Sequence, residues 1–127
     1  MLNKQVTFEI KIDGKIQTSF STEGEQKENQ LIFSDDLEHV YRFLIKDEEV
    51  YLYRTGTEEL VLVFRLAEKS GGTLKAEGFE FVMNVYTNRL DVSEHQLYLD
   101  YDLLDGNKKE SNHQLLVKWN QKRKETK

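Results

Sequence analysis

The sequence contains no cysteine and no proline, and each absence narrows what the chain can be. Without cysteine there is no disulfide framework and no thiolate chemistry, so a packed core alone must hold the fold. Proline cannot donate a ladder hydrogen bond, and its absence leaves every strand free to pair on both sides. A closed β-sheet is therefore chemically permitted along the whole chain.

Long apolar runs and an excess of basic charge are also missing. Residues 1–5 lead directly into alternating sequence, without the roughly 7–15-residue apolar stretch of a signal peptide, and no later run approaches membrane-spanning length. We therefore expect a cytoplasmic protein without membrane contact. The net charge of −5 argues against nucleic acid as a partner, and the basic C-terminal end has only Trp119 as an aromatic companion for stacking on bases.

The strongest signal present is an alternation of apolar and polar residues. Leu97, Leu99, Tyr101 and Leu103 occupy every second position, which is the period of a half-buried β-strand. A chain of 127 residues is one ordinary domain. We predict an all-β fold, a single antiparallel up-and-down calycin-like β-barrel of roughly eight to ten strands over residues 1–119, followed by a flexible charged C-terminal tail over 120–127.

The same alternation, interrupted by residues that favour turns, gives the expected order of elements. The predicted strands are 6–12, 16–20, 31–33, 38–45, 50–54, 60–66, 79–86, 97–103 and 115–119. The predicted turns and loops are 13–14, 21–28, 55–57, 70–72, 88–93 and 105–107. Such short connections leave no room for the crossover helices that parallel strands require.

One segment has two readings. Ser34, Asp35 and Asp36 resemble a helix N-cap, and the apolar residues of 37–45 fall at helical spacing. Residues 40–45 are instead rich in β-branched and aromatic types, and only a tight connection separates them from the next strand. We predict that 38–45 is extended, with Tyr41, Phe43 and Ile45 on one side.

The order of motifs resembles that of the YwiB-like family, which comprises small uncharacterised proteins of Gram-positive bacteria. The motifs that carry the resemblance are Val50 to Gly56, Leu62-Val63-Phe64, Gly78-Phe79 to Asn88, and Leu97 to Leu103. The resemblance implies a lipocalin-like, or calycin-like, barrel and implies no activity. Lipocalins carry a Gly-x-Trp on the first strand, whereas the only tryptophan here lies on the last predicted strand, so ligand transport is not implied.

The apolar phase of the strands predicts the core. We expect it to contain Phe8, Ile10, Leu52, Leu62, Phe64, Phe81, Met83, Leu99, Tyr101 and Val117.

Arg54 is the charged residue that departs from this pattern. It shares the parity of Val50 and Leu52, which should face the interior, so its guanidinium is expected at one mouth of the barrel. One interpretation is a structural arginine that closes the barrel end by stacking on an aromatic ring. The other is an anion-binding group, with Phe64, Met83 and Tyr101 as the walls of a ligand-binding site.

The sequence offers no catalytic or metal-binding constellation. His39, His95 and His113 lack metal-ligand spacing, and no serine lies in a nucleophile elbow. Asp100 and Asp102 share one face of a strand, but that polar face is expected to look outward. We expect no metal, no cofactor and no catalytic residue.

These observations favour a non-enzymatic protein that binds a small apolar or anionic amphipathic ligand. The alternative is a structural or protein-interaction module whose barrel is filled with its own side chains, and an enzyme is the third reading. We expect a monomer or a weak dimer, and the sequence identifies neither ligand nor protein partner.

Overall fold

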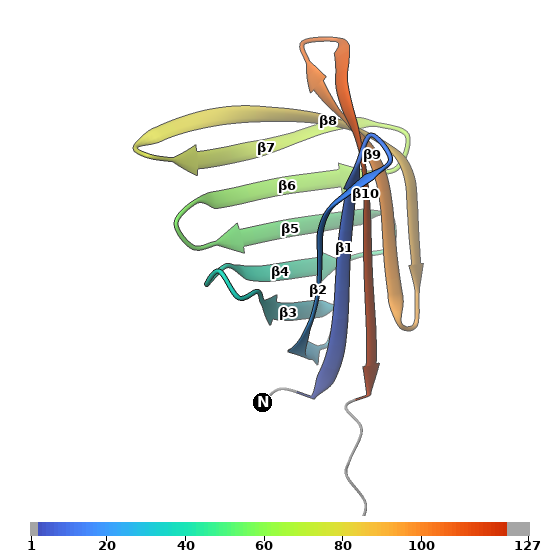
Figure 1. The fold of residues 1–127 in the computed structure, drawn as a ribbon. Coiled ribbons are helices and arrows are strands. Elements are labelled where there is room, and N and C mark those ends of the chain that lie inside the picture. Colours follow the sequence, from blue (N-terminus) through green and yellow to red (C-terminus); the bar gives the residue numbers. More distant parts are fainter. Residues whose placement is uncertain (1–2, 122–127) are drawn as a thin grey trace, which may run out of the picture.

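The computed structural model describes residues 3–121, and within them the chain forms ten β-strands and no helix (Figure 1). The strands are β1 (Lys4–Ile12), β2 (Lys15–Lys27), β3 (Gln30–Ser34), β4 (Val40–Ile45), β5 (Glu49–Thr55), β6 (Glu59–Arg65), β7 (Lys69–Ala76), β8 (Phe79–Ser93), β9 (Gln96–Asp105) and β10 (Lys108–Gln121). Accordingly, no helix in this part of the chain is long and apolar enough to cross a membrane.

The strands close into one barrel. Each strand pairs antiparallel with its neighbours in sequence, and β1 pairs with β10 as well as with β2. In Figure 1, β1 and β10 run steeply while β3 to β7 cross them at a large angle. The prediction of an all-β antiparallel barrel of eight to ten strands is confirmed, with ten strands in residues 3–121.

Turn chemistry explains the first hairpin. Asp13 and Gly14 have φ values of 50° and 83°, so both occupy the left-handed region that a two-residue hairpin turn of type I′ requires. The predicted hairpin is confirmed, and its turn side chain also reaches across the barrel seam, since Asp13 Oδ1 accepts a hydrogen bond of 2.9 Å from the backbone N–H of Asn112.

The segment with two readings is a strand. β4 begins at Val40, and Tyr41 and Phe43 point into the core, which confirms the extended prediction and excludes the helix. Residues 38 and 39 precede the strand, and Glu38 has a φ of 66°. The apparent N-cap at Asp35 instead holds a tight turn, described below.

The prediction of loops at 21–28 and 70–72 was wrong, because their glycines permit close strand approach rather than turns. Residues 21–27 belong to β2, where a Cβ added at Gly24 would lie 2.7 Å from the carbonyl oxygen of Ile32 and 2.9 Å from Val6 Cγ2. Residues 70–72 belong to β7, which the sequence reading missed. A Cβ on Gly72 would overlap the carbonyl oxygen of Val61 on β6.

Two strand ends also lie beyond their predicted positions. β8 continues through 88–93, expected as a loop, because a β-bulge between Thr87 and Arg89 lets the strand bend and pair onward with β9. β10 continues to Gln121, so the first two residues of the predicted tail are paired with β1. Residues 122–127 lie outside the described residues.

The core follows the predicted apolar phase with one error. Seven of the ten predicted core residues are buried: Phe8, Leu52, Leu62, Phe64, Leu99, Tyr101 and Val117. Ile10 and Met83 are partly buried against this core. The assignment of Phe81 to the core is wrong, because its side chain is 51% exposed. The exposure arises because β7 and β8 project beyond the barrel wall at their shared turn (Figure 1).

Candidate functional site

Three turns gather on one side of the barrel, which we call the mouth. The β3–β4, β5–β6 and β7–β8 connections all lie there (Figure 1). Strand register brings six inward-phase side chains into one cross-strand row, in which each residue lies directly opposite the next. This mouth row consists of Phe33, Tyr41, Arg54, Leu60, Leu74 and Phe81.

Asp35 organises the β3–β4 turn at the edge of the mouth. Its Oδ1 accepts hydrogen bonds from the backbone N–H groups of Leu37 and His39, at 2.9 and 3.0 Å. Its Oδ2 lies 3.0 Å from His39 Nδ1 and accepts a hydrogen bond of 3.2 Å from the Tyr41 hydroxyl. Burial favours protonation of this carboxyl, but the hydrogen bonds from His39 and Leu37 outweigh it and lower the pKa of Asp35.

Tyr41 connects this turn to Arg54. The Tyr41 ring is 6% exposed, and burial together with the nearby Asp35 carboxylate raises the pKa of its hydroxyl. Arg54 lies directly opposite on β5, and its positive charge acts on the same hydroxyl in the opposite direction. The Tyr41 hydroxyl therefore stays neutral and remains a hydrogen-bonding group on the strand next to Arg54.

Arg54 is mostly buried, with a side chain that is 25% exposed. Its Nη2 donates a hydrogen bond of 3.3 Å to Glu58 Oε1, and the Glu58 side chain is 44% exposed. The Arg54 Nε–H is buried without a hydrogen-bond partner. A buried guanidinium donor without an acceptor is unfavourable by about 1–3 kcal/mol, so its retention calls for a reason.

A second group of side chains, in the barrel interior, contains two of the predicted wall residues, Phe64 and Tyr101. The rings of Tyr101 and Phe64 have centroids 4.7 Å apart, and Tyr101 stacks on His113 at 5.0 Å. Burial strongly raises the pKa of the Tyr101 hydroxyl, while Arg54 is close enough to oppose that shift. Of the predicted site residues, Phe64 and Tyr101 are therefore in ring contact, whereas Arg54 pairs with Leu60, four residues along β6 from Phe64. Met83 lies on β8 opposite Gly72.

His113 and Ser111 form a pair that resembles a base and a nucleophile. Ser111 Oγ lies 2.8 Å from His113 Nε2, and burial lowers the pKa of His113, which keeps its imidazole neutral near pH 7. Asp13 and Asp102 act on this imidazole only through space. In residues 3–121 no carboxylate hydrogen-bonds the ring, so the third, orienting group of a catalytic triad is lacking.

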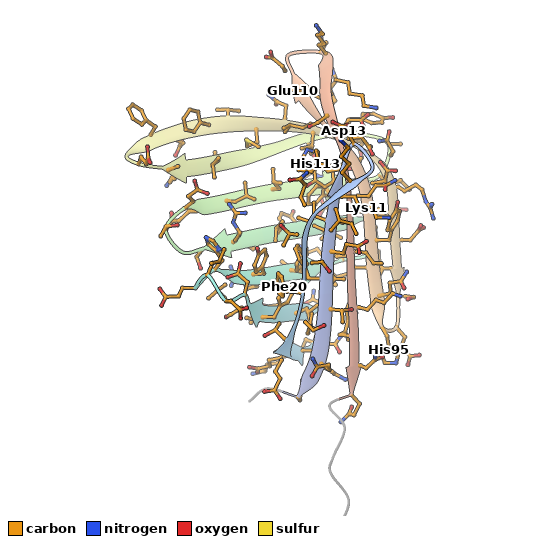
Figure 2. All side chains as sticks on the ribbon, viewed as in Figure 1. Lys11, Asp13, Phe20, His95, Glu110 and His113 are labelled. Atoms are coloured by element: carbon orange, nitrogen blue, oxygen red, sulfur yellow. The ribbon has the colours of Figure 1, made fainter. Side chains whose placement is uncertain are left out.

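Of the three histidines, His39 lies at the edge of the mouth through its contact with Asp35, and the other two lie elsewhere. Figure 2 shows His95 and His113 toward opposite ends of the barrel. The part of the chain that the structure describes holds no group of three histidine, aspartate or glutamate side chains placed to bind a metal ion. Asp100 and Asp102 share an outer face, where the Asn112 amide donates hydrogen bonds of 2.7 and 3.0 Å to them.

Sequence reasoning placed Arg54 at a barrel mouth but missed its neighbours. The sequence predicts that Tyr41 shares one side of its strand with Phe43 and Ile45, yet its position opposite Arg54 depends on the β4–β5 register, which parity alone does not define. Asp35 carried a usable signal, since an aspartate before a short irregular segment commonly accepts backbone hydrogen bonds. The contact between His113 and Tyr101 also depends on register, between β9 and β10.

Comparisons with known proteins agree with the fold and leave the site unassigned. A family model described as a domain of unknown function (DUF1934) matches residues 4–117. The solved structure titled "Crystal structure of ywiB protein from Bacillus subtilis" superposes with a TM-score of 0.70 at 19% identity, covering 96% of this chain and 92% of that one. At this identity the superposition shows the fold alone. No curated protein matches the chain. The resemblance to YwiB-like proteins is confirmed, and the chain belongs to the DUF1934 family.

Proposed function

We propose that this protein binds a small anionic amphipathic molecule at the mouth, with the anionic head group on Arg54. The observation that carries the proposal is the buried Arg54 Nε–H without an acceptor. Nε and one Nη of a guanidinium form the two-pronged donor that recognises a carboxylate or phosphate side-on. In Arg54 the Nε–H has no acceptor, and Nη2 donates to Glu58.

Glu58 occupies part of the position that a ligand carboxylate would take. Its contact with Arg54 is long, at 3.3 Å, and its side chain is nearly half exposed. Ion pairs of this kind typically contribute about 1 kcal/mol or less. A ligand that engages both Nε and Nη therefore gains more than it displaces, and Glu58 can turn to solvent.

The apolar part of the ligand is best accommodated along the mouth row. Phe64 is fully buried and Tyr101 is 5% exposed, so these rings are covered by core packing and form the floor beneath the site. Leu60 and Leu74 follow Arg54 in the row and are only partly buried. A short apolar tail lying across β6 and β7 would cover them, with Met83 at its flank.

We place this activity in the cytoplasm and regard it as binding rather than catalysis. The absence of cysteine favours a reducing compartment. The Ser111–His113 pair supplies a nucleophile and a base but no orienting carboxylate. The proposed site needs neither metal nor cofactor.

Isothermal titration calorimetry tests the proposal with decanoate and octyl phosphate as anionic probes and decanol as a neutral one. We expect the anions to bind and decanol to bind at least about tenfold more weakly, because the head-group contact supplies more than about 1.4 kcal/mol.

Two variants locate the site. Arg54→Met should weaken decanoate binding at least about tenfold, by the same head-group argument. Arg42→Met is the matched control, because Arg42 also lies on this sheet but stacks on Tyr53 on the outer face, at 4.5 Å. Binding of no probe, or equal binding by both variants, would contradict the proposal and favour an interaction module with a filled barrel.

A further inference from the structure

The N-terminal third of β8 has a partner strand on one side only. Asn84–Ser93 pairs with β9, whereas Phe79–Met83 pairs with β7 and with no other strand of residues 3–121. This segment lies in the part of the β7–β8 hairpin that projects past the barrel wall (Figure 1). Backbone N–H and C=O groups of alternate residues along such an edge are open to another strand.

This free edge lacks the protection that natural edge strands usually have. Phe79 is 67% exposed, Phe81 51% and Val82 73%. The segment contains no proline or lysine, and its one charged residue, Glu80, is ion-paired within the hairpin to Lys75 at 3.7 Å. Exposed apolar edges of this kind are templates for strand addition.

Unfilled space lies beside the edge. Where β8 and β9 diverge, a hollow of about 420 Å³ is lined by consecutive residues of β8 on one side and by the end of β9 on the other. Phe81, Val82 and Met83 contribute from β8, and Leu103 and Leu104 contribute from β9. Asn84, Asp105 and Glu110 also line the hollow, so an incoming strand would meet apolar side chains of both strands together with two carboxylates.

We propose that the free edge of β8 pairs with the same edge of a second copy of this chain, as an antiparallel two-fold dimer. A two-fold axis at Phe81 pairs all five free residues, Phe79 with Met83 and Phe81 with itself. On the other face it sets Glu80 opposite Val82 of the partner. An axis at Glu80 would oppose two like charges, and one at Val82 would require Asn84, which already pairs with Leu104.

The size of the contact makes the dimer weak. At 67% and 51% exposure, Phe79 and Phe81 can each bury on the order of 100 Å². With the edge backbone and Val82 included, the total remains below the roughly 1,200 Å² of a standard stable interface. The dimer is therefore concentration-dependent.

Self-association of the full chain tests the pairing. Sedimentation velocity from low-micromolar to millimolar concentration should show a monomer–dimer equilibrium. Phe81→Lys should raise the dimer dissociation constant at least about tenfold, since it removes apolar burial and opposes two like charges at the axis. Ile16→Lys, at a 59% exposed residue of β2, is the matched control and should change nothing.

Single cysteines test the register, because the natural chain has none. Phe81→Cys should form a disulfide-linked dimer under mild oxidation, because residue 81 faces itself across the axis within reach of a disulfide. Glu80→Cys and Val82→Cys should each cross-link slowly alone and rapidly when mixed. A monomer at every concentration, or equal cross-linking by all three and by Ile16→Cys, would overturn the proposal.

Discussion

Replacing Arg54 by methionine separates a ligand-binding arginine from a structural one, through the free energy of unfolding without ligand. The substitution keeps an unbranched side chain and removes the unpartnered Nε–H, a relief of about 1–3 kcal/mol. It also loses the contact with half-exposed Glu58, worth about 1 kcal/mol or less, and the interaction with Tyr41, worth about 1 kcal/mol.

These contributions nearly cancel. Tyr41 keeps Asp35 as a partner at 3.2 Å, so the variant leaves no new orphaned hydroxyl. We therefore expect a change between a loss of about 1 and a gain of about 2 kcal/mol. A group retained for function rather than stability behaves in this way, since its removal weakens binding while stability holds or rises.

Urea unfolding measures the change. Trp119 is the only tryptophan and is 2% exposed, so its fluorescence reports loss of the core. Arg42→Met, on the outer face, is the comparison variant. A loss of more than about 3 kcal/mol for Arg54→Met would refute the reasoning, because that is the scale on which breaking a buried charged network destabilises a protein.

Three further changes test the core, the electrostatics and the close strand approach. Leu62→Ala and Leu99→Ala should each lower the free energy of unfolding by about 2–5 kcal/mol in urea titrations, and a loss below about 0.5 kcal/mol at both would contradict the burial of these residues. Because burial lowers the pKa of His113 below 6.5, the unfolded chain binds its proton first and stability should fall as pH drops through about 6.5; His113→Gln should remove that dependence in thermal melts, and exposed His95→Gln should not. Gly72→Ala should fail to give a soluble folded protein, or should lower the melting temperature far more than Gly106→Ala, because a Cβ at residue 72 overlaps backbone of β6.

The alternation of apolar and polar residues was sufficient to predict the fold, because it is present in every strand that has one apolar face and one polar face. The exception was β7, whose inward phase is Ser70, Gly72, Leu74 and Ala76, and which therefore shows little contrast with its outward residues. Glycine in pairs ordinarily signals a turn. Here the pair serves close packing between strands, a tertiary requirement that no local pattern expresses.

The parity of Arg54 predicted its face, but the site around it depended on register. The sequence near Arg54 does not identify Tyr41 as its neighbour. The pairing of β4 with β5 could shift by two residues and still keep every side chain on its own face. The register in the structure resolves that choice and places Tyr41 opposite Arg54. Predicting the pair from sequence would have required the length of the β4–β5 turn to be known first.

Alternation also says which face a residue lies on without saying how far along the barrel it sits. Val85, Met83 and Phe81 share the inward phase of β8, yet Val85 is fully buried, Met83 is partly buried and Phe81 is 51% exposed. The gradient exists because β8 passes the end of β9 and leaves the barrel. Arg54 and Phe81 belong to the same mouth row, along which burial decreases from one end to the other. Phe33 and Tyr41 are buried in the core, whereas Arg54 is partly exposed and Phe81 is exposed. Both proposed binding surfaces lie in the part of the row that a paired sheet holds but core packing does not cover.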